Sequence, residues 1–305
     1  MFFEIRHKGT HYFRITMQKC RKMIFILFLC SLIRNFSLRE MLLPFERTKK
    51  TAIFLFLCSL IRNFADVEIN VYKMQNVEIH SCPELMDFIQ EVGFLPLLDS
   101  GIRGYSAEDV VDEDNRYVVF DDGGWDWPLW KWKGPIVTEG RCVYGKFFAG
   151  KVGFVSKEWW PDLCNYRRAS RPAPVEGSID EAILLTLAEH DSLITRELRA
   201  ACGFDGPKMR SKFDGYVTRL QMACRIVTED FVYPTDKHGR EYGWGWSLLT
   251  TPERLLGREM CQASPPNPLS KGRGGTPQES FERMKVHLSK LLPDATEKQI
   301  EKLIK

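Results

Sequence analysis

The sequence predicts an α+β protein with a small Trp-rich α+β domain, a winged helix-turn-helix domain and C-terminal helices. Apolar residues recur at helical spacing in three segments between 178 and 225. Alternating apolar residues then flank a turn-rich segment, 234–241. Six tryptophans fall between 125 and 160, ahead of these helices. We assign 74–175 to the Trp-rich domain, 176–256 to the winged helix-turn-helix domain and 277–305 to the C-terminal helices.

Residues 1–73 form a leader that differs from the rest of the chain. The decapeptide Leu27–Phe36 recurs unchanged as Leu55–Phe64, and two such copies indicate a duplicated, translated DNA element rather than a solenoid. The leader holds thirteen Lys/Arg and five Asp/Glu, a net charge of +8, whereas the remaining residues hold thirty and thirty-five. We expect a non-native or disordered leader and a functional protein that starts at Met74.

The two apolar runs of the leader are short. Met23–Ile33 and Ala52–Ile61 fall well below the roughly 20 residues that a membrane-spanning helix needs. The first run follows basic residues, as in a signal peptide, but no Ala-x-Ala-like cleavage site follows it. The nine cysteines include no Cys-x-x-Cys pair and are typical of reduced core thiols. We predict no membrane association and a cytoplasmic location.

In the Trp-rich domain, one helix and three strands are predicted. Leu85, Phe88, Ile89 and Val92 make one apolar helix face, which the segment 93–96 closes. The strands fall at 117–120, 141–148 and 153–156. The tryptophans favour an aromatic core, with a base-stacking pocket as the alternative. They are Trp125, Trp127, Trp130, Trp132, Trp159 and Trp160.

An acidic run between Asp109 and Asp126 raises the possibility of a metal site. It lacks the glycine and the distal glutamate of an EF-hand, so a solvated loop is favoured. The chain also contains no Walker loop, Rossmann glycine fingerprint or zincin motif. We expect no metal and no cofactor.

The winged helix-turn-helix prediction depends on local helix signals. Ser178 and Glu181 make a capping box at the start of the first helix. Thr195 is predicted to cap the second helix, and Gly203 to end it. The third helix is expected over 211–225.

Duplex DNA is the predicted partner of this segment. A cationic and polar stripe lies on the third helix and just upstream of it, at Lys208, Arg210, Lys212, Thr218 and Arg219. The wing tip adds Lys237, His238 and Arg240. We expect these side chains to contact the phosphate backbone, and the alternative is that they are ordinary solvated turn residues. The whole segment 178–250 is net acidic, with nine Lys/Arg against eleven Asp/Glu. A protein partner therefore stays an alternative.

The composition of residues 257–276 predicts a Pro/Gly-rich linker or insert. Thr276, Pro277 and Glu279 then start a helix with a cap, a first-turn proline and a carboxylate. Leu292-Pro293-Asp294 interrupts it, so two short helices are predicted. Their alternating charges favour a solvated surface or a packing appendage.

Several long strings in the chain resemble the bacterial AlkZ-related proteins. They are Tyr144–Ser156, Glu158–Asp162, Asn165–Arg168, Thr218–Met222, Asp236–Gly239 and Tyr242–Gly245. The resemblance covers about 80 to 256 and the C-terminal helices.

This resemblance implies a distant relation to the AlkZ/YcaQ-type DNA glycosylases, which stack winged helices and excise alkylated or crosslinked bases. Those enzymes use a Gln-x-Gln or Gln-x-Asp pair to hold the catalytic water. Gln221 matches the first amide, which makes it the candidate catalytic residue, but Ala223 replaces the second. We therefore predict a DNA-binding protein linked to repair or regulation without catalysis. A DNA glycosylase and a protein-interaction winged helix are the alternatives.

Overall fold

The computed structural model describes residues 2–5, 13–16, 77–121, 125–204, 206, 208–239, 241, 243–261 and 275–305. The chain divides into two compact units, Met1–Ala65 and Asp66–Lys305. In the first unit, β1 (Phe2–Ile5) pairs antiparallel with β2 (Phe13–Thr16). The duplicated decapeptides and residues 262–274 of the Pro/Gly-rich segment lie outside the described residues, so the predictions about them stay predictions.

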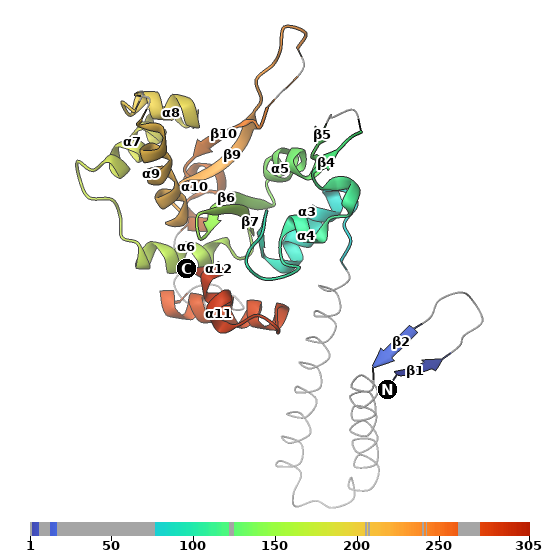
Figure 1. The fold of residues 1–305 in the computed structure, drawn as a ribbon. Coiled ribbons are helices and arrows are strands. Elements are labelled where there is room, and N and C mark those ends of the chain that lie inside the picture. The colour runs from blue at the N-terminus through green and yellow to red at the C-terminus, as the bar shows by residue number, and fades with distance from the viewer. Residues whose placement is uncertain are drawn as a thin grey trace, which may run out of the picture. The chain divides into compact units, whose positions relative to one another are not determined.

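One antiparallel sheet of six strands organises the second unit, in the order β3-β7-β6-β9-β10-β8 (Figure 1). This sheet confirms the α+β class. The pair Tyr144↔Thr228 joins β6 to β9, so strands before and after residue 176 share the sheet. Its strands are β3 (Phe94–Pro96), β6 (Cys142–Phe148), β7 (Lys151–Ser156), β8 (Ser192–Ile194), β9 (Val227–Val232) and β10 (Trp246–Thr250).

The first helix of this unit matches its prediction. α3 (Cys82–Val92) buries Leu85, Phe88, Ile89 and Val92. Gly93 ends it with φ +78°, and a Cβ there would lie 2.4 Å from the Trp159 ring, so only glycine fits. The segment Phe94–Pro96 was expected only to close the helix, but it is strand β3, because it finds hydrogen-bonding partners on β7.

The remaining elements before residue 176 are short. The predicted strand 117–120 is reduced to β4 (Val118–Val119), which pairs with β5 (Trp125–Asp126). Three helices here were not predicted: α4 (Ala107–Val110), α5 (Pro128–Thr138) and α6 (Trp160–Ser170).

The elements from 178 onward follow the predicted order with local differences. They are α7 (Ile179–His190), β8, α8 (Thr195–Ala201), α9 (Arg210–Met222), β9, β10 and α10 (Pro252–Leu256). The Ser178 hydroxyl accepts a bond from the Glu181 N–H, but the Glu181 carboxylate accepts from Gly177, one residue earlier than in a capping box. Gly203 has φ +74° and confirms the predicted stop.

Besides the Ser178–Glu181 capping box, two further local predictions in this segment are wrong. Thr195 is the first residue of α8 and does not cap it, because its hydroxyl donates to the Ser247 carbonyl at 3.2 Å across the sheet. α9 ends at Met222 rather than at 225, because Cys224 adopts a left-handed φ of +56°.

Two hydrophobic clusters stabilise the second unit. The larger one joins the sheet to α3, α5, α6 and the C-terminal helices. The smaller one lies among α7, α8, α9 and β10 and consists of Ile183, Leu187, Leu198, Phe204, Phe213, Val217, Leu220, Ile226 and Leu249. The segment after residue 178 thus has an apolar core of its own beside the shared sheet.

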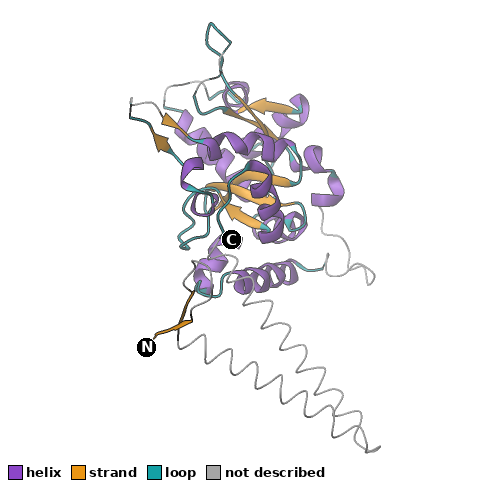
Figure 2. Cartoon of the chain, turned by 90° about the vertical axis from the view of Figure 1, so that its right-hand side faces the viewer, coloured by secondary structure: helices purple, strands orange, loops and turns teal. Residues whose placement is uncertain are grey.

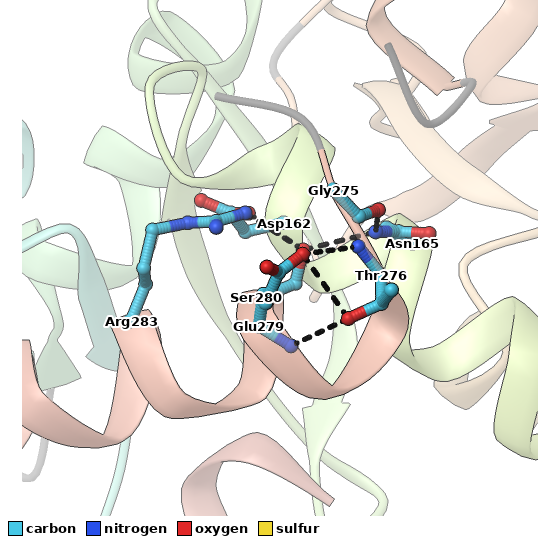
Figure 3. Close-up of polar contacts among 7 residues, drawn as sticks. All are labelled: Asp162, Asn165, Gly275, Thr276, Glu279, Ser280 and Arg283. Carbon is cyan, nitrogen blue, oxygen red and sulfur yellow. Dashed lines mark hydrogen bonds and ion pairs between the residues drawn. The ribbon is translucent and has the colours of Figure 1, made fainter. Parts of the chain in front are cut away.

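The C-terminal helices are α11 (Pro277–Leu291) and α12 (Glu297–Ile304), with the predicted break between them. Thr276 and Glu279 form the expected capping box. A polar cluster fixes α11 to α6 (Figure 3): Ser280 donates to Asp162 at 2.8 Å, and Asn165 donates to Ser280 at 3.0 Å. Because Met284, Leu288 and Ile304 are fully buried, these helices belong to the core rather than to a solvated surface.

The loop between β9 and β10 projects away from the sheet in both ribbon views (Figures 1 and 2). On the C-terminal side of the predicted turn-rich segment 234–241, the strand begins later than its alternating residues suggest, because β10 begins only at Trp246. Gly243 and Gly245 have φ near +77° and +71°, which takes the chain out of strand geometry before β10. Within the described residues, no helix is long and apolar enough to span a bilayer.

Candidate nucleic-acid interface

The start of α9 presents three exposed cations. The side chains of Lys208, Arg210 and Lys212 are exposed, and in the part of the chain that the structure describes they form no ion pair. The first turn of α9 contains no acidic residue. The positive end of the helix dipole adds to this charge, so the start of α9 is suited to an anion such as a phosphate.

Thr218 and Arg219, predicted on the same surface, contact other parts of the protein. Thr218 donates to the Asp214 carbonyl at 2.7 Å and accepts from Lys146 Nζ at 3.1 Å. Arg219 donates to Asp180 Oδ2 through Nε at 3.1 Å and Nη2 at 2.6 Å. These contacts tie α9 to β6 and α7, whereas the cations at the start of α9 have no such role.

The tip of the β9–β10 loop carries the second group of predicted residues. Lys237 and His238 are exposed. The backbone N–H of His238 donates to Asp236 Oδ1 at 2.8 Å, and Thr235 pairs with Glu241, so the turn is ordered by its own hydrogen bonds. Arg240 lies outside the described residues.

Gln221, the candidate catalytic amide, is buried with 3% of its surface exposed. Its Oε1 accepts the backbone N–H of Lys146 at 3.1 Å. Ala223, at the position of the second amide in the glycosylase pair, is also buried. As placed, Gln221 holds α9 against β6 and is closed to solvent.

The tryptophans form a cluster that sequence reasoning did not anticipate. Only Trp160 is fully buried, and Trp125 is 49% exposed, so the expectation of a common aromatic core is wrong for Trp125. The carbonyl of Trp244 accepts from Trp130 Nε1 at 3.0 Å and from Lys133 Nζ at 3.1 Å. These partners lie more than a hundred residues away along the chain. The closely spaced tryptophans predict a region rich in aromatic side chains. They do not predict its contact with Trp244, which lies far away in the sequence.

Lys133 is buried beneath this cluster, with 1% of its surface exposed. Its Nζ lies 3.3 Å from the centroid of the Trp130 ring and 4.4 Å from that of Phe231. Burial lowers the pKa of Lys133 to about 7, because the charged ammonium loses its water. No carboxylate among the described residues pairs with it.

The acidic run serves local structure. Asp112 accepts from the Asn115 backbone at 3.0 Å and from His80 Nδ1, and Ser106 donates to Asp109 at 2.8 Å. Across the described residues, no group of three or more His, Cys, Asp or Glu side chains is arranged to hold a metal ion.

These features define an α+β protein in which an exposed cationic helix start and a projecting hairpin loop belong to the same segment. A family model described as AlkZ related matches residues 79–305. The chain therefore belongs to the AlkZ-related family, and the predicted resemblance is confirmed. No curated protein and no solved structure matches the chain.

Proposed function

We propose that the segment 178–250 is a winged helix that binds duplex DNA, with α9 as the recognition helix and the β9–β10 loop as the wing. The observation that carries this proposal is the element order α7-β8-α8-α9-β9-β10 with β8, β10 and β9 adjacent and antiparallel. Helix-turn-helix domains dock their recognition helix through its N-terminal residues. In this chain those residues are Arg210 and Lys212, with Lys208 two positions before α9, and none of the three forms an ion pair with another described residue.

The charges near the start of α9 and on the wing set the expected strength of binding. Lys208, Arg210 and Lys212 supply three cations, and Lys237 with His238 supplies one or two more on the wing. Each phosphate contact releases counterions and contributes to salt-dependent affinity. Since the rest of the segment is acidic, we expect moderate affinity that depends on these few residues.

Membership of the AlkZ-related family supports a link to DNA repair. We favour binding without catalysis, because Gln221 is buried against Lys146 and Ala223 has no amide to offer a water. Base release from an alkylated duplex that is lost in Gln221→Ala would instead assign a DNA glycosylase. Absence of nucleic-acid binding at low salt would favour a protein-interaction winged helix.

The double variant Arg210→Ala/Lys212→Ala tests the assignment of the surface. Losing two phosphate contacts should weaken binding of the full chain to a duplex by about 10-fold or more at moderate salt. The measurement is fluorescence anisotropy with a labelled duplex. The matched control is Lys290→Ala/Lys298→Ala, which removes two exposed cations from the C-terminal helices. Equal affinities of the two double variants would contradict the proposal.

A further inference from the structure

Three aromatic rings form an exposed ladder beside the proposed wing. The ring centroids of Tyr117 and Trp125 are 5.8 Å apart with planes at 27°, and those of Trp125 and Trp244 are 5.1 Å apart at 21°. The three residues are 49%, 49% and 50% exposed. Aromatic side chains of this size usually bury most of their surface. Because the rings stack on one another, Trp125 lies between Tyr117 and Trp244, and the ladder offers a ligand the outer faces of Tyr117 and Trp244.

The ladder is held by rigid contacts beneath it. The Trp244 carbonyl accepts two hydrogen bonds, from Trp130 and Lys133. Trp127 packs edge-on against Trp244 at 6.0 Å and against Tyr117 at 5.9 Å. Because this support is already formed, a planar ligand would not have to order the rings before it stacks on them.

Nucleobases are the planar ligand that this location favours. Trp244 lies in the same β9–β10 loop as Lys237 and His238, between the Thr235–Glu241 bridge and the first residue of β10, so the ladder and the proposed wing tip belong to one hairpin. Asp126, next to Trp125, is paired with Lys131 at 2.6 Å, which offsets one negative charge near the rings. Stacking on aromatic rings strengthens the binding of each base and tolerates any sequence.

We propose that the ladder of Tyr117, Trp125 and Trp244 stacks the bases of an unpaired DNA strand that continues from the duplex bound by α9 and the wing. The preferred ligand is then a junction between duplex and single strand. The position of the unpaired strand in this proposal rests on the proposed duplex binding by α9 and the wing. The stacking of its bases depends only on the three rings of the ladder.

Affinities for three probes test the proposal with the full chain: a blunt duplex, the same duplex with a tail of about six thymidines, and the free single strand. In the wild type the tail should tighten binding by about 10-fold, a value within the range that stacking one or two bases gives. Trp125→Leu removes the middle ring that supports Tyr117 and Trp244, so it should lose this gain and keep its affinity for the blunt duplex. Trp125→Phe, which retains a ring, should keep most of the gain.

Trp246→Leu is the matched control, because Trp246 is an exposed tryptophan of the same hairpin that lies outside the ladder. If the wild type binds the blunt and the tailed duplex equally well, the proposed base stacking is wrong, and the proposed duplex binding is unaffected. Single-strand binding that Trp125→Leu abolishes, with no binding of blunt duplex, would overturn the duplex proposal alone. Failure to bind all three probes would overturn both. Self-association that Trp125→Leu removes, with no tail effect, would assign the ladder to a second copy of the chain.

Discussion

Arg167→Ala is expected to lower the free energy of unfolding by about 4 kcal/mol, because it removes a buried donor and leaves a void. The Arg167 guanidinium is fully buried and holds three elements together. It donates to the carbonyls of Ile304 at 2.8 Å and Leu303 at 3.3 Å in α12, and of Phe147 at 2.6 Å in β6. Burial lowers its pKa to about 10, so it stays charged at neutral pH.

Chemical denaturation measures this effect in the full chain. Arg103→Ala, at an exposed arginine, is the matched control and should change stability by less than about 0.5 kcal/mol. Because the lost bonds anchor α12, the variant should also expose the C-terminal helices to proteolysis. An Arg167→Ala protein as stable as the Arg103→Ala protein would contradict the role of the guanidinium as the common donor for these carbonyls.

Lys133→Met is expected to change how stability depends on pH. Lys133 has a pKa of about 7 in the folded protein and an ordinary value of 10.5 in the unfolded chain. Between these values the unfolded state binds more protons, so the free energy of unfolding rises with pH. Below about pH 7 Lys133 is protonated in both the folded and the unfolded state, so its contribution to the free energy of unfolding no longer changes with pH. Relative to the methionine variant, the wild type should gain about 1.5 kcal/mol between pH 7 and pH 8.5.

The comparison of the two proteins at each pH isolates Lys133 from the other titrating groups. Burial raises the pKa of Cys142 to about 12, and it raises that of Tyr144 as well, but both groups are present in both proteins. Methionine fills a similar volume without a charge, so the aromatic cluster should remain folded. Parallel pH profiles for the two proteins would contradict a neutral Lys133 in the folded state above pH 7.

Elements whose signals are local could be predicted from the sequence. The cap at Ser178, the stop at Gly203 and the start at Thr276 each depend on neighbouring residues, and the structure has all three. Helix α5 was missed because Gly134 and Pro135 oppose helix formation in its interior. Its buried residues pack into the larger core, so tertiary contacts stabilise this helix against its propensity.

The contrast between local signals and tertiary contacts also decides which residues of the candidate interface could be predicted from the sequence. The cations at the start of α9 follow from local pattern, because exposed residues near a helix start need no partner. The engagement of Thr218 with Lys146, 72 positions away, and of Arg219 with Asp180, 39 positions away, depends on how α9 packs. The aromatic ladder likewise needs Trp244 to lie on Trp125, which no periodicity encodes.

A salt titration of duplex binding by the full chain tests the central claim most directly. Four to five phosphate contacts, from the start of α9 and the proposed wing, predict that log K falls with log salt at a slope of about −3.5 to −4.5. The slope should become less steep by about two in Arg210→Ala/Lys212→Ala. Binding that does not respond to salt, or no binding of duplex DNA at low salt, would contradict the proposal that the segment 178–250 binds DNA.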